Sequence, residues 1–201
     1  MTTPASVDID VLRSEIQKTY TAVSERRRPD FIFPTGRGWA ESLGYPKAEL
    51  DRVPDSTAES FAGVANPFGL GRLRAGETAL DLGCGAGTDL LIAAQMVGPT
   101  GMAIGIDITS GMVARARESA AEMGLDNVEV HEGPIEQLPF RDASVDVVIS
   151  NGVIDLVPDK DTVFSEVERV LKPGGRLQIA DVVIHRPVSE EAKRDIDLWT
   201  G

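Results

Sequence analysis

The chain has 201 residues, 42% of them hydrophobic, which is enough to bury one core and argues against a disordered protein. Its formal net charge is −12 and its pI is about 4.6, so binding of nucleic acid through a basic surface is excluded. A single cysteine and two histidines exclude an intrachain disulfide and a metal site rich in cysteine or histidine.

The N-terminal stretch MTTPASVDIDVLRSEIQ lacks the basic start, apolar core and cleavage site of a signal peptide. No apolar stretch reaches the roughly 18 residues that a membrane span needs. The short basic run Arg26–Arg28 is more typical of a solvated helix end than of an anion site. We therefore expect a cytoplasmic protein with no membrane span.

Residues 1–75 and 76–201 differ in character, and we expect an N-terminal cap of helix and loop followed by a ligand-binding domain. Helical spacing of apolar residues extends from Val7 to Arg28, where Pro29 is expected to end the helix. A second, short helix is expected over Pro46–Val53. The aromatic residues of this segment either pack the core of the cap, which we favour, or line an acceptor pocket: Phe31, Phe33, Trp39, Phe61 and Phe68.

From Thr78 onward, short apolar strands alternate with helices. Strands are expected over Thr78–Leu82, Met102–Asp107, Val128–Glu132, Val145–Ser150 and Gly175–Ile184. Helices are expected over Thr88–Gly98, Ser110–Gly124, Lys160–Leu171 and Ser189–Trp199. This alternation predicts an α/β fold, Rossmann-like and doubly wound, with a mainly parallel sheet and helices on both of its faces.

In such a sheet a ligand binds at the carboxyl ends of the strands, near the point where the strand order reverses. The loop LGCGAG (82–87), Asp107, EGPIE (132–136) and SNGV (150–153) all follow strands and should meet at this rim. An Asn-Gly pair alone would favour a hairpin turn. Because a parallel strand precedes Asn151-Gly152, we predict instead that this pair forms the floor of a pocket.

The loop after the first predicted strand has the glycines that a close backbone approach to a ligand requires, at Gly83, Gly85 and Gly87. An acid at the end of the next strand, Asp107, would accept hydrogen bonds from ribose hydroxyls. NAD and S-adenosylmethionine both fit this pattern. Thr88 stands where a dinucleotide loop has its third glycine or an alanine, and Asp81 would repel a pyrophosphate but attract an ammonium or sulfonium group, which favours S-adenosylmethionine.

Cys84 lies inside this loop. A nucleophilic cysteine needs a base nearby, and no histidine lies close to it in the sequence. We therefore interpret Cys84 as a small residue of the cofactor loop and assign it no catalytic role.

Four stretches together resemble the class I S-adenosylmethionine-dependent methyltransferases: ALDLGCGAG, GIDIT, LPF…SVDVVISN and RVLKPGGRL. The similarity extends from about Asn66 to Gly201, some two thirds of the chain. It is strongest to the branch of the arsenite methyltransferases and the quinone-biosynthesis C-methyltransferases, with VGPTG (97–101), SNGVIDLVPDK (150–160) and DIDLW (195–199) similar to the arsenite group.

The resemblance implies a role for each matching position. The glycine loop and Asp81 would surround the methionine part and the ribose, Asp107 would hold the ribose hydroxyls, Ile108 and Ile135 would meet the adenine, and Asn151 would lie below the methionine portion. The predicted cofactor-binding residues are Asp81, Gly83, Cys84, Gly85, Gly87, Asp107, Ile108, Thr109, Met112, Pro134, Ile135, Asn151 and Gly152. The implied partner is a small-molecule methyl acceptor, and a homodimer is considered; no metal is expected.

The sequence departs from the arsenite group at its thiols. The family has a cysteine after the asparagine of the SN stretch, where this chain has Gly152. A second family cysteine precedes the NP pair, and here the run Ala62–Pro67 reads AGVANP. A third would follow the LW pair near Gly201, where the sequence stops. These departures predict that arsenite is not the acceptor.

Two further departures concern the cofactor and the sheet. Relatives have an acid where this chain has Pro134, and proline offers no carboxylate to the adenine amino group, so weaker cofactor binding is expected. The family's sheet has seven strands, and its last two would follow the helix expected from Ser189. Either the sheet is reduced or the sequence is not the entire gene product.

Methyl transfer from a sulfonium centre relies on positioning, with a general base needed only when the acceptor keeps its proton. His185, Asp155 and Asp181 are candidate bases at strand ends, and each has an alternative as a capping or surface residue. The catalytic residues therefore stay unassigned. The leading hypothesis is a small-molecule methyltransferase; the alternatives are an S-adenosylmethionine-binding domain without transferase activity and an NAD-dependent dehydrogenase.

Overall fold

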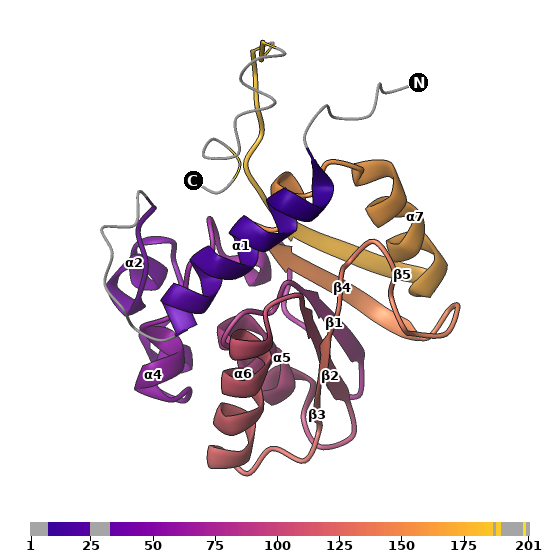
Figure 1. The fold of residues 1–201 in the computed structure, drawn as a ribbon. Coiled ribbons are helices and arrows are strands. Elements are labelled where there is room, and N and C mark those ends of the chain that lie inside the picture. The colour runs from indigo at the N-terminus through magenta and orange to yellow at the C-terminus, as the bar shows by residue number, and fades with distance from the viewer. Residues whose placement is uncertain (1–7, 25–32, 187, 190–198, 200–201) are drawn as a thin grey trace.

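Five parallel strands form one sheet in the order β3-β2-β1-β4-β5 (Figure 1). The computed structural model describes residues 8–24, 33–186, 188–189 and 199. The strands are β1 (Thr78–Leu82), β2 (Met102–Asp107), β3 (Val128–Glu132), β4 (Val145–Asn151) and β5 (Leu171–Ala180). The predicted Rossmann-like, doubly wound parallel sheet is confirmed, and its first three strands have the predicted bounds.

Helices cover both faces of this sheet. α5 (Thr88–Val97) and α6 (Ser110–Glu122) pack on one face, and α7 (Lys160–Val170) packs on the other. Leu91 of α5 belongs to the core on the first face, and Val167 of α7 belongs to the core on the second. Because the strands are apolar on both sides, the sheet is buried between the two layers.

The N-terminal part of the chain packs against α5 and α6, the helices on the first face of the sheet. Its elements are α1 (Ile9–Ser24), α2 (Arg37–Ser42), α3 (Lys47–Leu50), α4 (Asp55–Ala58) and the 3-10 helix η1 (Pro67–Leu70). Figure 1 shows α1 crossing over α6, with α2 and α4 beside it. Of the aromatic residues of this segment, Phe61 and Phe68 are buried and pack around Tyr45, as expected. Phe61 also lines the cavity described below, as the alternative interpretation proposed.

Several predicted helix bounds differ from the structure. The first helix was expected over Val7–Arg28, and its described part is Ile9–Ser24, with residues 25–32 outside the described chain. The second was expected over Pro46–Val53 but is a single turn, Lys47–Leu50. The sequence did not predict α2 or α4, because helices this short carry almost no periodic pattern. The last expected helix, 189–199, lies almost wholly outside the described residues, as does Phe31.

The fifth strand was expected over Gly175–Ile184, and this was wrong at both ends. β5 begins at Leu171 and contains an irregularity opposite Val145 to Val147, so the KPGG stretch belongs to the strand. β5 ends at Ala180, which pairs with Asn151, the last residue of β4. Beyond that point the described residues offer no strand for this segment to pair with, and the next three apolar residues are exposed: Val182, Val183 and Ile184.

The three central strands, β1, β2 and β4, end at the same edge of the sheet. Leu82 of β1 pairs with Ile106 of β2 on one side and Ser150 of β4 on the other. The chain adds β2 and β3 on one side of β1 and then returns to add β4 and β5 on the other side, so the strand order reverses between β1 and β4. The polar residues after these strands therefore share one rim, which is where such sheets bind ligands.

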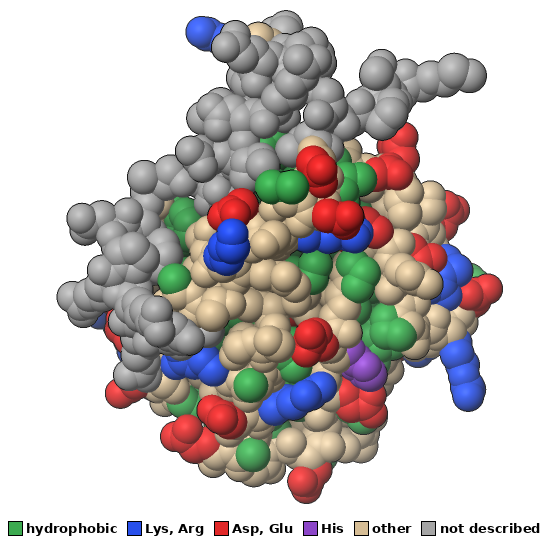
Figure 2. Space-filling view, viewed as in Figure 1, with side chains coloured by type: hydrophobic (Ala, Val, Ile, Leu, Met, Phe, Trp, Pro, Cys, Tyr) green, Lys and Arg blue, Asp and Glu red, His purple; other side chains and the backbone are tan. Residues whose placement is uncertain are grey.

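On the face shown in Figure 2, lysine and arginine side chains are interspersed with aspartate and glutamate. Within the described residues, no helix is both long and apolar enough to cross a membrane. The same residues contain no group of three or more histidine, cysteine, aspartate or glutamate side chains placed to hold a metal ion.

Candidate functional site

A cavity lies at the carboxyl ends of the strands, beneath α1. Its empty space is about 1090 Å3, part of which is open solvent. Twelve of the thirteen residues predicted from the sequence line it: Asp81, Gly83, Cys84, Gly85, Asp107, Ile108, Thr109, Met112, Pro134, Ile135, Asn151 and Gly152. The structure therefore brings together four loops that are up to 71 residues apart in the sequence.

Gly87, the thirteenth predicted residue, is not among the cavity-lining residues. It precedes α5 in a left-handed conformation, and a Cβ atom there would lie 3.2 Å from the Cβ of Ala116 in α6. Gly87 thus lets α5 and α6 pack closely at the start of the helix.

The glycine loop is folded against β2. The amides of Gly83 and Cys84 donate to the carbonyl of Ile106, at 2.8 and 3.0 Å. Gly83 has φ +65°, and a Cβ atom at this position would lie 2.4 Å from Cγ2 of Val153. Only glycine fits here, because both the backbone conformation and the space exclude a side chain.

Asp107 is fixed by the same loop. Its carboxylate accepts hydrogen bonds from the amides of Gly85 (2.9 Å) and Thr109 (2.8 Å). Burial raises the pKa of Asp107, and these amides oppose the increase. A carboxylate has about four acceptor sites, so this group can still accept hydrogen bonds from two adjacent hydroxyls of a ligand.

Cys84 is buried, and its sulfur packs over Gly105 of β2, where an added Cβ would lie 2.8 Å away. Burial and then the charges of Asp107 and Asp81 raise the pKa of its thiol. The thiol therefore stays protonated at neutral pH, which agrees with a packing role and not with nucleophilic catalysis.

Asp81 is the unusual residue of this cavity. Its side chain is 3% exposed, and its Oδ2 atom is buried without a hydrogen-bond partner among the described residues. Burial, followed by the charges of Asp89 and Asp107, raises the pKa of Asp81 well above its ordinary value. An unpaired buried carboxylate is costly, so this oxygen is suited to meet a cationic group of a ligand.

A hydrogen-bond network joins the N-terminal segment to the floor of the cavity. Tyr45 donates its hydroxyl to Asp89 Oδ1 at 2.6 Å, and Asn151 Nδ2 contacts Asp89 Oδ2 at 3.0 Å. The amide oxygen of Asn151 accepts from the amides of Val64 (2.8 Å) and Ala65 (3.2 Å). Asn151 thus forms part of the floor and also holds the segment before η1 in place.

The pKa of Asp89 is raised to about 6, because burial outweighs the hydrogen bonds from Tyr45 and Asn151 that favour its charged form. Asp89 follows the glycine loop, in the first turn of α5, and lines the cavity together with Asp81 and Asp107. Three carboxylates with raised pKa values, of which Asp81 and Asp89 are buried and Asp107 is partly buried, therefore surround the same space.

α1 closes the cavity from above. Arg13 forms an ion pair with Glu136 at 3.0 Å, and Gln17 donates to the carbonyl of Ile108 at 3.0 Å. Leu12, 1% exposed, and Tyr20 of the same helix line the cavity. Residues at these helical spacings lie on one face, which explains how α1 contacts the loops that follow β2 and β3.

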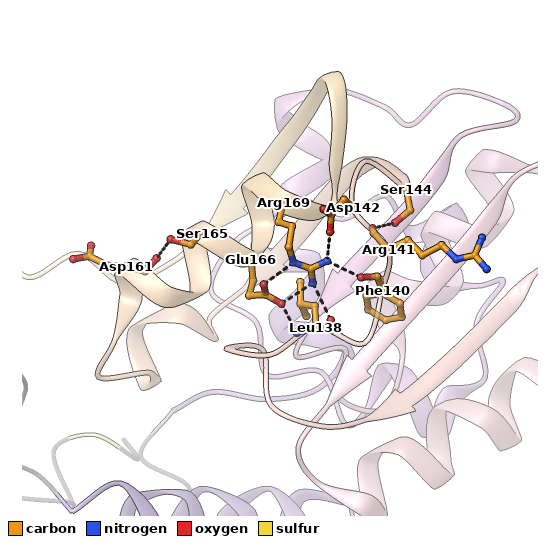
Figure 3. Close-up of polar contacts among 9 residues, drawn as sticks. All are labelled: Leu138, Phe140, Arg141, Asp142, Ser144, Asp161, Ser165, Glu166 and Arg169. Carbon is orange, nitrogen blue, oxygen red and sulfur yellow. Dashed lines mark hydrogen bonds and ion pairs between the residues drawn. The ribbon is translucent and has the colours of Figure 1, made fainter.

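The loop after β3 forms another wall of the cavity and is held in place by side chains of α7. Pro134, Ile135 and Glu136 line the cavity. Further along this loop, Arg169 of α7 donates to the carbonyls of Leu138 (2.9 Å) and Phe140 (2.7 Å), as Figure 3 shows. Arg169 also pairs with Glu166 and Asp142, and Glu166 accepts from the amide of Leu138 at 2.7 Å.

Replacing Arg169 with glutamine is expected to lower the free energy of unfolding by about 2 kcal/mol, since the two loop carbonyls and Glu166 lose their donor. Urea denaturation measures this change. Arg72 is a matched control, because it is 67% exposed and makes one ion pair, with Glu49. Arg72→Gln is expected to change stability by no more than about 0.5 kcal/mol. Equal effects of the two substitutions would contradict the role of Arg169.

Sequence reasoning missed Tyr45, Asp89, Tyr20 and Arg13. Asp89 had a detectable signal, since it directly follows the glycine loop. The other three lie in the N-terminal segment, far from the motifs. Only the fold brings Arg13 and Tyr20 to the cavity and Tyr45 to Asp89. His185 is exposed and does not line the cavity.

Asp155 and Asp181 lie next to one another and are not among the residues that line the cavity. Asp181 accepts from the amides of Ile154 and Asp155, at 3.0 and 3.3 Å. Burial and then the charge of Asp181 raise the pKa of Asp155 to about 7. Asp181 thus acts as a cap for the turn at Ile154, the alternative that the sequence left open for it.

Comparison with known proteins gives a consistent result. Residues 73–200 match the family model described as methyltransferase domain. Arsenite methyltransferase of Halobacterium salinarum is 46% identical over 162 residues, which are 81% of this chain and 41% of that protein. Demethylmenaquinone methyltransferase of Oceanobacillus iheyensis is 37% identical over 105 residues, 52% of this chain and 44% of that protein.

Among solved structures, the chain is similar to an arsenic(III) S-adenosylmethionine methyltransferase from Chlamydomonas reinhardtii. The TM-score is 0.67 at 37% identity, and the match covers 73% of this chain and 51% of that one. The chain therefore spans only 41% to 51% of the length of these three relatives.

Proposed function

Because the chain belongs to the methyltransferase domain family, within the class I S-adenosylmethionine-dependent methyltransferases, we propose that it binds S-adenosylmethionine in the cavity beneath α1 and catalyses methyl transfer to a small-molecule acceptor. The observation that carries this proposal is the buried, unpartnered carboxylate oxygen of Asp81. S-adenosylmethionine has a sulfonium and an ammonium group, which match a cavity lined by Asp81, Asp89 and Asp107.

The residues of the cavity fit the cofactor part by part. Asp81 would hold the ammonium group, and the glycine loop from Gly83 leaves space for the methionine part. Asp107, already oriented by two amides, would hold the ribose hydroxyls. Ile108 and Ile135 would pack against the adenine. We therefore retain the cofactor-binding set predicted from the sequence as a proposal and add Asp89 to it, with Gly87 supporting the loop from outside.

When bound, S-adenosylmethionine supplies an activated methyl group on a positively charged sulfur. The protein's contribution is then to position and shield the reactants. α1 covers part of the rim, the Arg13–Glu136 pair connects α1 to the wall after β3, and Asn151 supports the floor. The thiol of Cys84 stays neutral and takes no part.

Cofactor affinity is expected to rise with pH between 5.5 and 7. The pKa of Asp89 is raised because burial disfavours its charged form. Protonated Asp89 therefore contributes to the stability of the fold below about pH 4, and this contribution is lost as the pH rises through about 6. A cationic ligand favours the ionised carboxylates and must displace protons at low pH. The proton on Asp89 lowers the affinity for S-adenosylmethionine about fourfold at pH 5.5. A proton on Asp81, whose pKa is also raised, lowers this affinity further.

Isothermal titration calorimetry with S-adenosylmethionine at pH 5.5, 6.2 and 7.0 tests this dependence. Titration in two buffers of different ionisation enthalpy at pH 6 should show net proton release. An affinity that is constant over this range, or a net uptake of protons, would contradict the prediction.

We propose that the acceptor is not arsenite, although relatives with that name are similar in sequence. A Cβ atom on Gly152 would lie 3.2 Å from Cγ1 of Val64. The two segments in which the arsenite group has cysteines are thus adjacent in space here, and both lack sulfur. Cys84 is buried in the cofactor loop. Arsenic is a soft centre that prefers thiolates, which supports a different acceptor.

The decisive experiment uses S-adenosylmethionine labelled at the methyl group. Calorimetric binding together with label transfer to a metabolite extract, and none to arsenite, is the expected result. Binding without transfer would favour the alternative, a cofactor-binding domain without transferase activity. NAD binding in place of S-adenosylmethionine would overturn the proposal.

Three broader expectations remain proposals as well. Residues 1–75 would act as a cap and residues 76–201 as the cofactor-binding domain, which the contacts of α1 and Tyr45 at the cavity support. A homodimer would be detected by sedimentation velocity. A cytoplasmic location would be detected by cell fractionation.

A further inference from the structure

The cavity has two chemically different parts. Carboxylates of Asp81, Asp89 and Asp107 project from the ends of the strands and the start of α5. The remaining wall comes mainly from α1 and from the segment that follows β4, and its side chains are apolar: Ile9, Leu12, Ile16, Val153, Leu156 and Val157. A molecule that binds next to the cofactor must contact this apolar wall.

The charges of the cavity select against anions. Glu136 adds a fourth carboxylate to the lining, and its ion pair with Arg13 at 3.0 Å neutralises that guanidinium. The other three carboxylates have no cationic side chain among their hydrogen-bond partners in the described structure. A negatively charged acceptor would thus be repelled, since charges interact strongly where water is excluded.

Tyr20 places one polar group in this apolar wall. Its side chain lines the cavity, and its hydroxyl makes no hydrogen bond to the residues that the structure describes. Burial, then the charges of Asp155 and Asp107, raise the pKa of Tyr20, so the hydroxyl stays protonated. A tyrosine hydroxyl that lines a cavity and has no partner among the described residues can donate a hydrogen bond to a ligand.

We propose, on the basis of the methyl transfer inferred above, that the acceptor is an apolar molecule without negative charge that accepts a hydrogen bond from Tyr20. In the transfer, a lone pair of the acceptor forms the new bond to the methyl carbon, and the electrons of the broken carbon–sulfur bond stay on sulfur. With an uncharged acceptor the positive charge passes to the product. The carboxylates then face a cation before and after the reaction.

Binding of matched probes to the protein saturated with S-adenosylhomocysteine tests the charge preference. 4-Butylphenol and 4-butylbenzoate have the same apolar chain and differ in charge at pH 7. The phenol is expected to bind at least tenfold more tightly by calorimetry. Equal or tighter binding of the benzoate would overturn the proposal, as would failure of both probes to bind.

Two substitutions test the location. Leu156→Lys is expected to reduce the preference for the phenol at least fivefold, because it adds a cation to the apolar wall. Leu70→Lys is the control, since Leu70 is 68% exposed and does not line the cavity, and it should leave the preference unchanged. Equal effects of the two would place the probes elsewhere and overturn the proposal.

Tyr20→Phe tests the hydrogen bond. It is expected to weaken 4-butylphenol threefold to tenfold and to change the dissociation constant of S-adenosylmethionine less than twofold. Unchanged phenol binding, or a loss of cofactor affinity in its place, would overturn the assignment of Tyr20 to the acceptor. If S-adenosylmethionine does not bind the wild-type protein, the proposed function itself fails, which distinguishes the two ideas.

Discussion

Replacing Asp81 with asparagine is expected to weaken S-adenosylmethionine binding about a hundredfold or more, equivalent to about 3 kcal/mol. Asparagine has the same shape, so the cavity is preserved. The carboxylate that would pair with the ammonium group is removed, and its Oδ2 atom is buried without a hydrogen-bond partner in the described structure.

The same substitution is expected to stabilise the protein in the absence of cofactor. At pH 8 the free energy of unfolding should rise by about 1–3 kcal/mol, because asparagine removes the cost of burying this carboxylate, either as a charge or by taking up a proton. Opposite effects on affinity and stability would distinguish a ligand-binding carboxylate from a structural one. Calorimetry and urea denaturation measure the two quantities.

Asp126 provides the matched control for Asp81, since its side chain is exposed. Asp126→Asn should leave cofactor affinity unchanged and alter stability by less than about 0.5 kcal/mol. If Asp81→Asn bound S-adenosylmethionine as tightly as the wild type, the proposed role of Asp81 would be wrong.

Asn151→Leu is expected to lower the free energy of unfolding by about 3–5 kcal/mol. Leucine is similar in size but makes no hydrogen bonds. It would leave Asp89 without one donor, the amides of Val64 and Ala65 without their acceptor, and the carbonyl of Ala65 without its donor. Each buried group left without a partner costs about 1–3 kcal/mol, and urea denaturation measures the sum.

Tyr45→Phe is the milder comparison within the same network. It removes only the hydroxyl, which donates to Asp89 at 2.6 Å, and preserves the ring that packs on Phe61 and Phe68. We expect a loss of about 1–1.5 kcal/mol. A cost of Asn151→Leu below that of Tyr45→Phe would show that Asn151 does not hold the N-terminal segment to the sheet.

The sheet and most of the cavity could be predicted because their signals are local. Short segments rich in apolar residues marked β1, β2 and β3, and the glycines after β1 predicted a close backbone approach. Given a parallel sheet, the carboxyl ends of its strands meet, so Asp81, Asp107 and Asn151 had to lie near one another. The prediction failed at β5, because its end depends on where β4 stops pairing.

The sequence by itself determined the alternation of strands and helices, the rim that carries the site and the acids and glycines on it, since each follows from periodicity or from a short motif. Only the tertiary structure decided that α1 closes the cavity, that Tyr45 contacts Asp89, and that Gly87 packs against a helix while Asp81 keeps an unpaired oxygen. The physical reason is that hydrogen bonds and desolvation act between atoms adjacent in space. Tyr45 and Asn151 are 106 residues apart, and no local pattern encodes a contact over that separation.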